Sequence, residues 1–256
     1  MQIYVCVKQV PDSAANITIV DEKRIDESIA FLLNPYDEHA VTEAVALKNQ
    51  FEGSEIIAVC LGKKDAEKTI RSAMAMGADR GILIETDAIH DSMTTARALK
   101  VAIEQDGAPG IILTGKESID SEGMQTMFRI GALFDFPVIT NAVKIEAREA
   151  RANVTYALTG GQTRTCELSM PCVVAAGRGL NTPAYPTFPD VVKSRKKPLK
   201  VVDLDSLAID TPPGSARLVE LEPLVQARTP RQISGSPREI AARIATILKE
   251  EAKVVP

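Results

Sequence analysis

The residues best suited to chemistry lie in one polar loop, which follows the apolar run at residues 111–113. That run is short, rich in β-branched residues and bounded by Gly110 and Gly115, a pattern that predicts a buried parallel strand. A helix is expected to begin near Ser121, because apolar residues then recur at helical spacing as far as Phe134. Six polar side chains surround this junction: Lys116, Glu117, Ser118, Asp120, Ser121 and Glu122.

The chemistry that such a loop supports is the binding of an anion, above all a phosphate group. The first N–H groups of a helix have no partner inside the helix, and they attract negative charge. In an open parallel sheet the ligand crevice lies beyond the carboxyl ends of the strands, where this loop is expected. We therefore hypothesise that the loop holds a nucleotide phosphate. An ordinary strand-to-helix connection is the alternative, and the residues alone leave it open.

Other chemistries have little support in the sequence. Gly110 to Lys116 fits the start of a P-loop, but Glu117 stands where that motif needs the magnesium-binding Ser or Thr. His39 and His90 are the two histidines, which disfavours a histidine-rich metal site. No nucleophile elbow for a Ser–His–Asp triad is visible. We expect no catalytic residue and no metal ligand in this chain.

Length and composition favour a cytoplasmic protein with a sizeable core. The chain has 256 residues, of which 45% are hydrophobic. A net charge of −4, 4% aromatic residues and no tryptophan argue against nucleic-acid binding. No apolar run reaches the ~18 residues of a membrane span, and the start lacks a signal-peptide pattern. The cysteines have no C-x-x-C spacing and are expected to be reduced and mostly buried: Cys6, Cys60, Cys166 and Cys172.

Alternating strand and helix patterns predict the body of the fold. Short apolar runs at residues 3–7, 56–60 and 82–84 are typical of buried strands. Asn34 and Pro35 are expected to open a helix, with the acidic Asp37 in its first turn. Gly77 is expected to end the next helix, at residues 65–76, and Asp91 to cap a third that runs to about residue 105. Strands that alternate with helices at this spacing imply βαβ units, and so an α/β fold with a parallel sheet flanked by helices.

The pattern changes beyond Pro137. Short strands are expected at residues 138–146, 153–158 and 163–169, as β-hairpins added to the parallel core, and another at 172–176. From Pro183 onward prolines concentrate, so we expect no continuation of the sheet there.

We expect two regions: an α/β domain at residues 1–190, and a Pro-rich linker with a C-terminal arm at residues 191–256. Ser236 and Pro237 predict the start of a last helix in the arm. A single short helix is marginal in water, so this one is expected to pack on the core or on a partner. Its apolar face would be formed by Ile240, Ile244, Ile247 and Leu248.

Five segments of the chain carry specific sequence patterns. They are VKQVPD (7–12), LNPYDEHAVTEAVALK (33–48), AMGADRGILIETD (75–87), GKESID (115–120) with Gln125 and Thr126, and LNTPAYPTFPDVVKSRKKPL (180–199). The Asn-Pro-Tyr-Asp-Glu and Leu-Asn-x-Pro-x-Tyr patterns among them are far more specific than a single glycine motif. Together the segments resemble the small (β) subunit of the electron-transfer flavoprotein family, and they cover nearly the whole chain in the family's order.

The resemblance implies a Rossmann-like adenine-nucleotide-binding domain that pairs with a larger α subunit as a heterodimer. In most members the α subunit carries the redox-active FAD and the β subunit binds AMP as a structural ligand. Such a carrier accepts electrons from dehydrogenases, here expected to be acyl-CoA dehydrogenases, and passes them to a quinone-linked or other acceptor. This chain would then be an electron-transfer subunit and not an enzyme. The alternative is the bifurcating branch, whose β subunit binds a second FAD and oxidises NADH.

Carried over by position, the resemblance also implies site residues. Thr126 favours AMP, because a hydroxyl and free N–H groups suit a terminal phosphate. Met124 and Met127 depart from the usual AMP-type loop, and the opening VKQVPD is more similar to the bifurcating branch. The expected nucleotide-binding residues are Cys6 (through its backbone), Asn34, Leu61, Asp120, Ser121, Gln125 and Thr126.

The same resemblance implies a docking segment for dehydrogenases. Leu180 corresponds to the hydrophobic anchor of the docking loop, and Tyr185 lies in the same stretch of prolines and polar residues. The alternative for Leu180 is a packing role at the edge of the core, and the sequence leaves it open.

Overall fold

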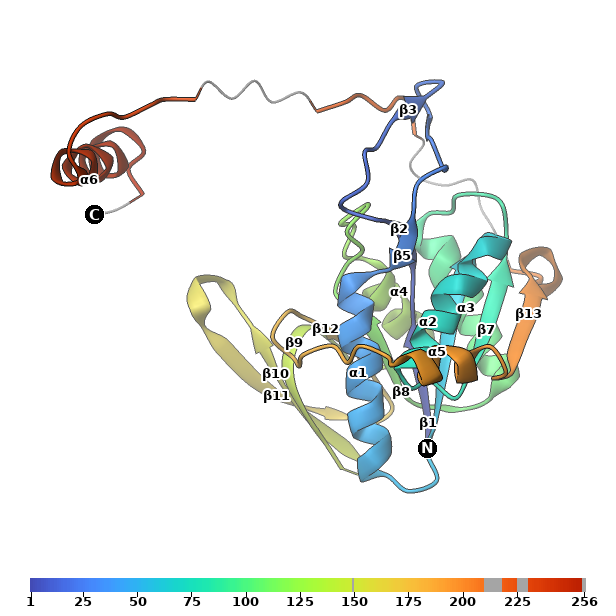
Figure 1. Cartoon of the computed structure of the whole chain (residues 1–256). Helices are drawn as coiled ribbons and strands as arrows, with labels where there is room; N and C mark the ends of the chain where they lie inside the picture. Colours follow the sequence, from blue (N-terminus) through green and yellow to red (C-terminus); the bar gives the residue numbers. More distant parts are fainter. Residues whose placement is uncertain (149, 210–217, 225–229, 255–256) are drawn as a thin grey trace. The chain divides into compact units, whose positions relative to one another are not determined.

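The structure is a computed structural model that describes residues 1–148, 150–209, 218–224 and 230–254. The chain divides into two compact units, Met1–Val219 and Glu220–Pro256. The first unit contains one nine-stranded sheet with helices on both faces (Figure 1). The expected start of the C-terminal arm at residue 191 therefore falls inside the first unit.

The large sheet is parallel through its centre and antiparallel at one side. Its strand order is β11-β10-β9-β12-β8-β1-β6-β7-β13. The strands β9, β12, β8, β1, β6, β7 and β13 are neighbours in this order, and each pairs in parallel with the next. On the other side of β9, the strands β9, β10 and β11 form an antiparallel meander. This confirms the predicted parallel core with added hairpins. The strands are β1 (Gln2–Cys6), β6 (Glu55–Gly62), β7 (Arg80–Glu85), β8 (Pro109–Gly115), β9 (Val138–Ala147), β10 (Arg151–Ala157), β11 (Thr163–Ser169), β12 (Cys172–Ala176) and β13 (Leu199–Asp203).

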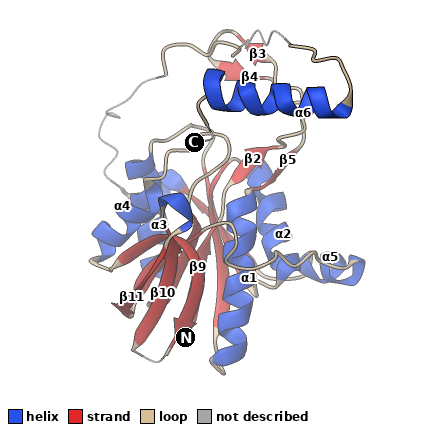
Figure 2. Cartoon of the chain, turned by 90° about the vertical axis from the view of Figure 1, so that its left-hand side faces the viewer, coloured by secondary structure: helices blue, strands red, loops and turns tan. Residues whose placement is uncertain are grey.

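Alternation along the strands assigns the helices to the two faces of the sheet. On β1, Ile3 and Val5 belong to one core cluster together with buried residues of α1 and α2. Tyr4 and Cys6 belong to the other cluster, with buried residues of α3 and α4. Figure 2 shows these two pairs of helices on opposite sides of the sheet. The helices are α1 (Pro35–Gln50), α2 (Glu67–Met76), α3 (Ser92–Asp106), α4 (Thr126–Phe134) and α5 (Phe188–Ser194).

Several local predictions are confirmed. Asp91 caps α3, since its side chain accepts a hydrogen bond from the Thr94 backbone N–H at 2.8 Å. Gly77 follows α2 with φ at 135°, a left-handed conformation that glycine adopts readily. Asn34 occupies the N-cap position of α1, but its side chain makes no cap hydrogen bond.

Two expectations were wrong. The sheet does continue beyond Pro183, because residues 199–203 form β13 and pair in parallel with β7 as an edge strand. The helix after β8 begins at Thr126 and not near Ser121. Glu122 and Met124 have φ values of 47° and 49°, and this left-handed backbone cannot continue a right-handed helix.

Two small ribbons and several short helical turns complete the first unit. The ribbons are β2 (Gln9–Pro11) with β5 (Phe31–Leu33), and β3 (Ile19–Val20) with β4 (Arg24–Ile25). The turns are η1 (Lys64–Ala66), η2 (Thr159–Gly161) and η3 (Leu204–Leu207).

The second unit contains α6 (Pro237–Thr246), which continues as π-helical turns at η4 (Ile247–Glu251). The prediction of a helix start at Ser236 is confirmed: Ser236 and Glu239 form a capping box. No residue of α6 is buried, and Ile244 and Leu248 are exposed. Within the described residues, no helix combines the length and apolar character needed to cross a membrane.

Candidate functional site

The site is built around the point where the strand order reverses. After β1 the chain moves to β6 and β7 on one side, and it then returns to β8 on the other side of β1. The connection after β1 leads to α1 on one face, whereas the connection after β8 leads to α4 on the other. In open α/β sheets the ligand crevice lies at such a point, here beyond the carboxyl ends of β1 and β8, and nucleotides bind there in such folds. The polar loop at residues 116–125 starts at this position.

Asn34 holds this loop in place. Its side chain is 1% exposed and belongs to the residue just before α1. The amide donates a hydrogen bond to the backbone oxygen of Glu117 at 2.9 Å and accepts one from the backbone N–H of Ile119 at 3.2 Å. The side chain that the sequence predicted as a helix cap therefore bonds to a loop more than eighty residues away in sequence. This contact supports a place for Asn34 at the site.

Lys8 lies at the centre of the loop's polar side chains. Its Nζ donates to both carboxylate oxygens of Asp120, at 2.7 and 2.8 Å, and to Ser118 Oγ at 3.1 Å. Ser121 Oγ is 3.5 Å from the same nitrogen and 2.8 Å from Ser118 Oγ. The structure thus gathers Asp120 and Ser121 around one cation from the end of β1. Lys8 was missed as a site residue; its place directly after the first strand could have identified it.

Asp37 was also missed. It was expected only as an acidic residue of the first turn of α1, yet its side chain is 4% exposed. It accepts hydrogen bonds from the backbone N–H of Lys8 at 2.7 Å and of Gly115 at 3.0 Å. Burial raises the pKa of Asp37 to about 7, although these donors and Asn34 oppose the shift.

The start of α4 contributes the other end of the loop. Gln125 is the N-cap residue and is exposed; its side-chain oxygen accepts a hydrogen bond from Arg129. Thr126 is the first helical residue and is half-buried. Met127, one of the two departures noted in the sequence, is buried in the second core cluster beneath the helix, and Met124 is exposed. The loop presents N–H groups and hydroxyls but carries no Mg²⁺-binding motif.

Cys6 and Leu61 lie on the same edge of the sheet. Cys6 ends β1 opposite Thr114 of β8, and Leu61 is near the end of β6 and half-buried. Burial raises the pKa of the Cys6 thiol, so the group is neutral. All the predicted nucleotide-binding residues therefore lie at the carboxyl edge of the sheet or in the loop and helix start that follow it.

The predicted docking segment is fixed to α1. Asn181 donates hydrogen bonds to the backbone oxygen of His39 and to Glu43, each at 3.0 Å. Leu180 is half-buried and packs against the first core cluster, as its packing alternative expects, and its docking role stays a prediction. Tyr185 is 88% exposed, and nearby Phe188 is 81% exposed.

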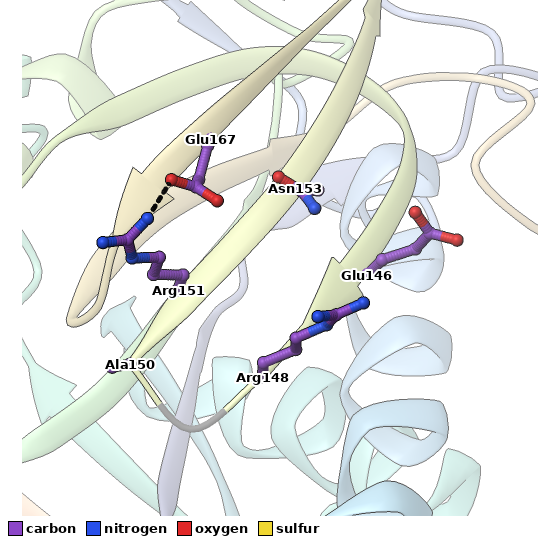
Figure 3. A pocket seen from close by; sticks show the side chains of 6 residues that line it. All are labelled: Glu146, Arg148, Ala150, Arg151, Asn153 and Glu167. Atoms are coloured by element: carbon purple, nitrogen blue, oxygen red, sulfur yellow. Dashed lines mark hydrogen bonds and ion pairs between the residues drawn. The ribbon is translucent and has the colours of Figure 1, made fainter.

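A separate polar depression lies on the antiparallel meander (Figure 3). Its side chains come from β9, β10 and the β9–β10 connection, and from β11, and they include an exposed ion pair between Arg151 and Glu167 at 2.6 Å. Charges of both signs in a solvated position are typical of a strand's outer face, so we assign it no function. Among the described residues, no group of three or more His, Cys, Asp or Glu side chains could hold a metal ion.

Comparisons with known proteins agree with this arrangement. Residues 23–207 match the family model of the electron transfer flavoprotein domain. The chain is 32% identical over 259 residues to the electron transfer flavoprotein subunit beta of Bacillus subtilis, covering all of both chains. It is 33% identical over 259 residues to the mitochondrial β subunit of Arabidopsis thaliana, again covering both chains fully. It is 34% identical over 216 residues to the Bos taurus β subunit, covering 82% of this chain and 84% of the relative. This chain therefore belongs to the electron transfer flavoprotein family and is similar to its β subunits along its whole length.

Proposed function

We propose that this chain is the β half of a two-subunit electron carrier and that it binds AMP as a structural ligand. A larger α subunit would carry the redox-active FAD, as the resemblance to the family implies. The pair would accept electrons from dehydrogenases, among them acyl-CoA dehydrogenases, and pass them to a quinone-linked or other acceptor. In this function the chain has no catalytic residue of its own.

The observation that carries the nucleotide assignment is the preformed loop at the reversal point between β1 and β8. Asn34 fixes the loop backbone through Glu117 and Ile119. Lys8, which is ion-paired with Asp120, lies beside Ser118 and Ser121. The Lys8 ammonium, these hydroxyl groups and the N–H groups at the start of α4 are donors that suit a phosphate.

The bifurcating alternative has one specific observation in its favour. The opening Val7-Lys8-Gln9-Val10-Pro11-Asp12 is more similar to that branch, in which the β subunit holds a second FAD. Both ligands contain an AMP moiety, so the same loop would contact the shared phosphate in either case. The two functions differ in the number of flavins and in the oxidation of NADH.

We also propose that Tyr185 presents the docking surface for the donor dehydrogenase, together with Phe188. Tethering of Asn181 to α1 keeps this segment in place while the two aromatic side chains extend into solvent. Large exposed aromatic side chains on a fixed segment are typical of interface anchors. Leu180 supports the segment from the core side.

Cofactor content tests the proposal. The full chain is co-expressed with an electron transfer flavoprotein α subunit, and the purified complex is analysed for released nucleotides and for its flavin absorbance. We expect one FAD and one AMP per heterodimer, with no oxidation of NADH. Two FAD molecules and NADH oxidation would establish the bifurcating alternative. A complex without any nucleotide assignable to this chain would overturn both.

A further inference from the structure

The proposed function does not require the buried carboxylate of Asp37. It lies in the first turn of α1 and is 4% exposed. An ionised side chain at such a position costs stability unless it is fully hydrogen-bonded, so its presence needs a reason. Buried groups with displaced pKa values concentrate at functional sites.

The contacts of Asp37 join β1 and β8, the two strands at the point where the strand order reverses. Oδ2 accepts a hydrogen bond from the backbone N–H of Lys8, just beyond β1, at 2.7 Å. Oδ1 accepts one from the backbone N–H of Gly115, the last residue of β8, at 3.0 Å. One carboxylate therefore connects the ends of two neighbouring strands to the start of α1.

From Asp37, two connections continue into the nucleotide loop. Oδ1 also accepts a hydrogen bond from the Asn34 side-chain amide at 3.0 Å, and that amide holds the loop at Glu117. The backbone N–H of Lys8 donates to Asp37, and the side-chain Nζ of Lys8 donates to Asp120 in the loop. Both sides of the loop thus depend on a single acceptor group.

All three partners of Asp37 are donors, so the contacts need the ionised form. A protonated carboxyl would present an O–H toward N–H groups and would lose at least one of the three bonds. Burial raises the pKa of both nearby thiols, to about 12 for Cys60, so these remain neutral. The titratable and charged groups around Asp37 are Cys6 on β1, Lys8 after it, Cys60 on β6, and Lys116 with Glu117 after β8, the last two paired at 2.9 Å.

We propose that ionised Asp37 is a positioning residue that holds the nucleotide loop in its binding conformation and makes nucleotide affinity depend on pH. This inference rests on the proposed function of the loop. We call the three hydrogen bonds that Asp37 accepts from Lys8, Gly115 and Asn34 the clamp. Because burial raises the pKa of Asp37 to about 7, all three bonds are present above neutral pH, and at least one is lost as the pH falls below it.

Stability follows the opposite course, which separates a positioning role from a purely structural one. The pKa of this carboxyl lies above the unfolded value of 3.8, so the folded chain holds the proton more tightly. The stability from this group is therefore present at low pH and is lost as the pH rises toward about 7. Asp37 makes all three of its hydrogen bonds at high pH, where its ionised form reduces the stability of the fold. This is not expected of a residue whose only role is to stabilise the fold.

The experiment compares the wild type with Asp37→Asn in the full-length chain paired with its α subunit. Asp79→Asn is the matched control. The Asp79 carboxylate also accepts a hydrogen bond from a backbone N–H, that of Ile56 at 2.8 Å, but it lies at the opposite edge of the sheet from the loop. Affinities for AMP and for adenosine 5′-methyl phosphate are measured between about pH 5.5 and 8.5. The methyl ester is needed because the phosphate of AMP itself titrates near pH 6, whereas a phosphate diester keeps a single negative charge over this range. Amide hydrogen-exchange protection at Lys8 and Gly115 is followed over the same range.

We expect the wild-type affinity for the methyl ester and the protection of both amides to fall together below about pH 7. Asp37→Asn should bind either ligand roughly tenfold to a hundredfold more weakly at pH 8, with a flat pH profile for the methyl ester. Asp79→Asn should retain the wild-type affinity and profile. The same profile in Asp37→Asn as in the wild type would overturn the inference.

Two further outcomes separate this inference from the proposed function. A wild-type complex that binds no adenine nucleotide, but whose two amides lose protection below pH 7, would support the clamp and overturn the function proposed for the loop. If neither the amide protection of the wild type nor its affinity for the methyl ester changes with pH, Asp37 does not control the loop. This measurement needs no variant to fold.

Discussion

Gly115 offers a sharp test of the site, because it leaves no room for a side chain. A Cβ added at this position would lie 2.3 Å from Asp37 Oδ1, 2.7 Å from Tyr36 Cβ and 3.0 Å from the Tyr36 carbonyl carbon. The carbonyl carbon of Tyr36 belongs to the backbone of α1, and its Cβ is bonded directly to that backbone. A change of side-chain rotamer therefore cannot relieve the overlap. In Gly115→Ala the end of β8 must move away from α1 by roughly 1 Å to restore ordinary contact distances.

The cost can be estimated from the contacts that this movement disturbs. Overpacking of this kind costs about 1–3 kcal/mol. Loss of the hydrogen bond from the Gly115 N–H to the Asp37 carboxylate adds about 1.5–3 kcal/mol. For a chain of this size about 1 kcal/mol corresponds to a Tm change of roughly 2–4 °C. The sum is about 2.5–6 kcal/mol, so we expect Gly115→Ala to lower Tm by about 5–24 °C and to release the bound nucleotide.

Gly123 provides the control, since it lies in the same loop and a Cβ there would meet no atom within 4 Å. Gly123→Ala should keep Tm and nucleotide content within error of the wild type. The assay is thermal unfolding of the purified heterodimer, with released nucleotide measured by chromatography. If Gly115→Ala melts like Gly123→Ala and retains its nucleotide, the close approach of β8 to α1 does not shape the site.

Three further predictions address the loop, the docking segment and the opposite edge of the sheet. Thr126→Glu should expel the nucleotide by charge repulsion and remove its stabilisation, ~2.7 kcal/mol at a hundredfold excess over Kd; unchanged AMP content would place the phosphate elsewhere. Tyr185→Ala should weaken dehydrogenase-driven flavin reduction roughly tenfold with normal Tm, whereas Leu180→Ala should lower Tm instead; the reverse pattern would make Leu180 the anchor. Arg80→Ala should reduce the free energy of unfolding by about 1.5–3 kcal/mol in a denaturant titration, because it removes two hydrogen bonds to half-buried Asp106, while nucleotide content stays the same.

The sequence by itself determined the order and type of most elements. The spacing of apolar residues predicted the strands of the parallel core and the helices between them. Single residue types predicted helix ends, such as Asp91 at the start of α3 and Gly77 at the end of α2. These features depend on residues within a few positions of one another, so they can be recognised in the sequence. The family was also visible, because its motifs are contiguous stretches such as residues 33–48.

Only the tertiary structure decided which side chains work together at the site. Asn34 and Glu117 are 83 positions apart, and Lys8 and Asp120 are 112 apart, so their contacts exist only after β1 and β8 become neighbours in the sheet. Asp37 looked like a first-turn helix residue because that role is local, whereas its buried contacts are not.

The same reason explains the wrong expectations. Residues 121–125 have side chains that suit a first helical turn, but the left-handed backbone at Glu122 and Met124 delays α4 to Thr126. Residues 199–203 lie among prolines, and β13 forms because the exposed edge of β7 offers a partner. The burial of Leu180 and the exposure of Tyr185 depend on how their segment lies on the core. That segment is held to α1 by the hydrogen bonds of Asn181. Apolarity and spacing are properties of the chain, whereas burial, pairing and charge environment arise when remote segments meet.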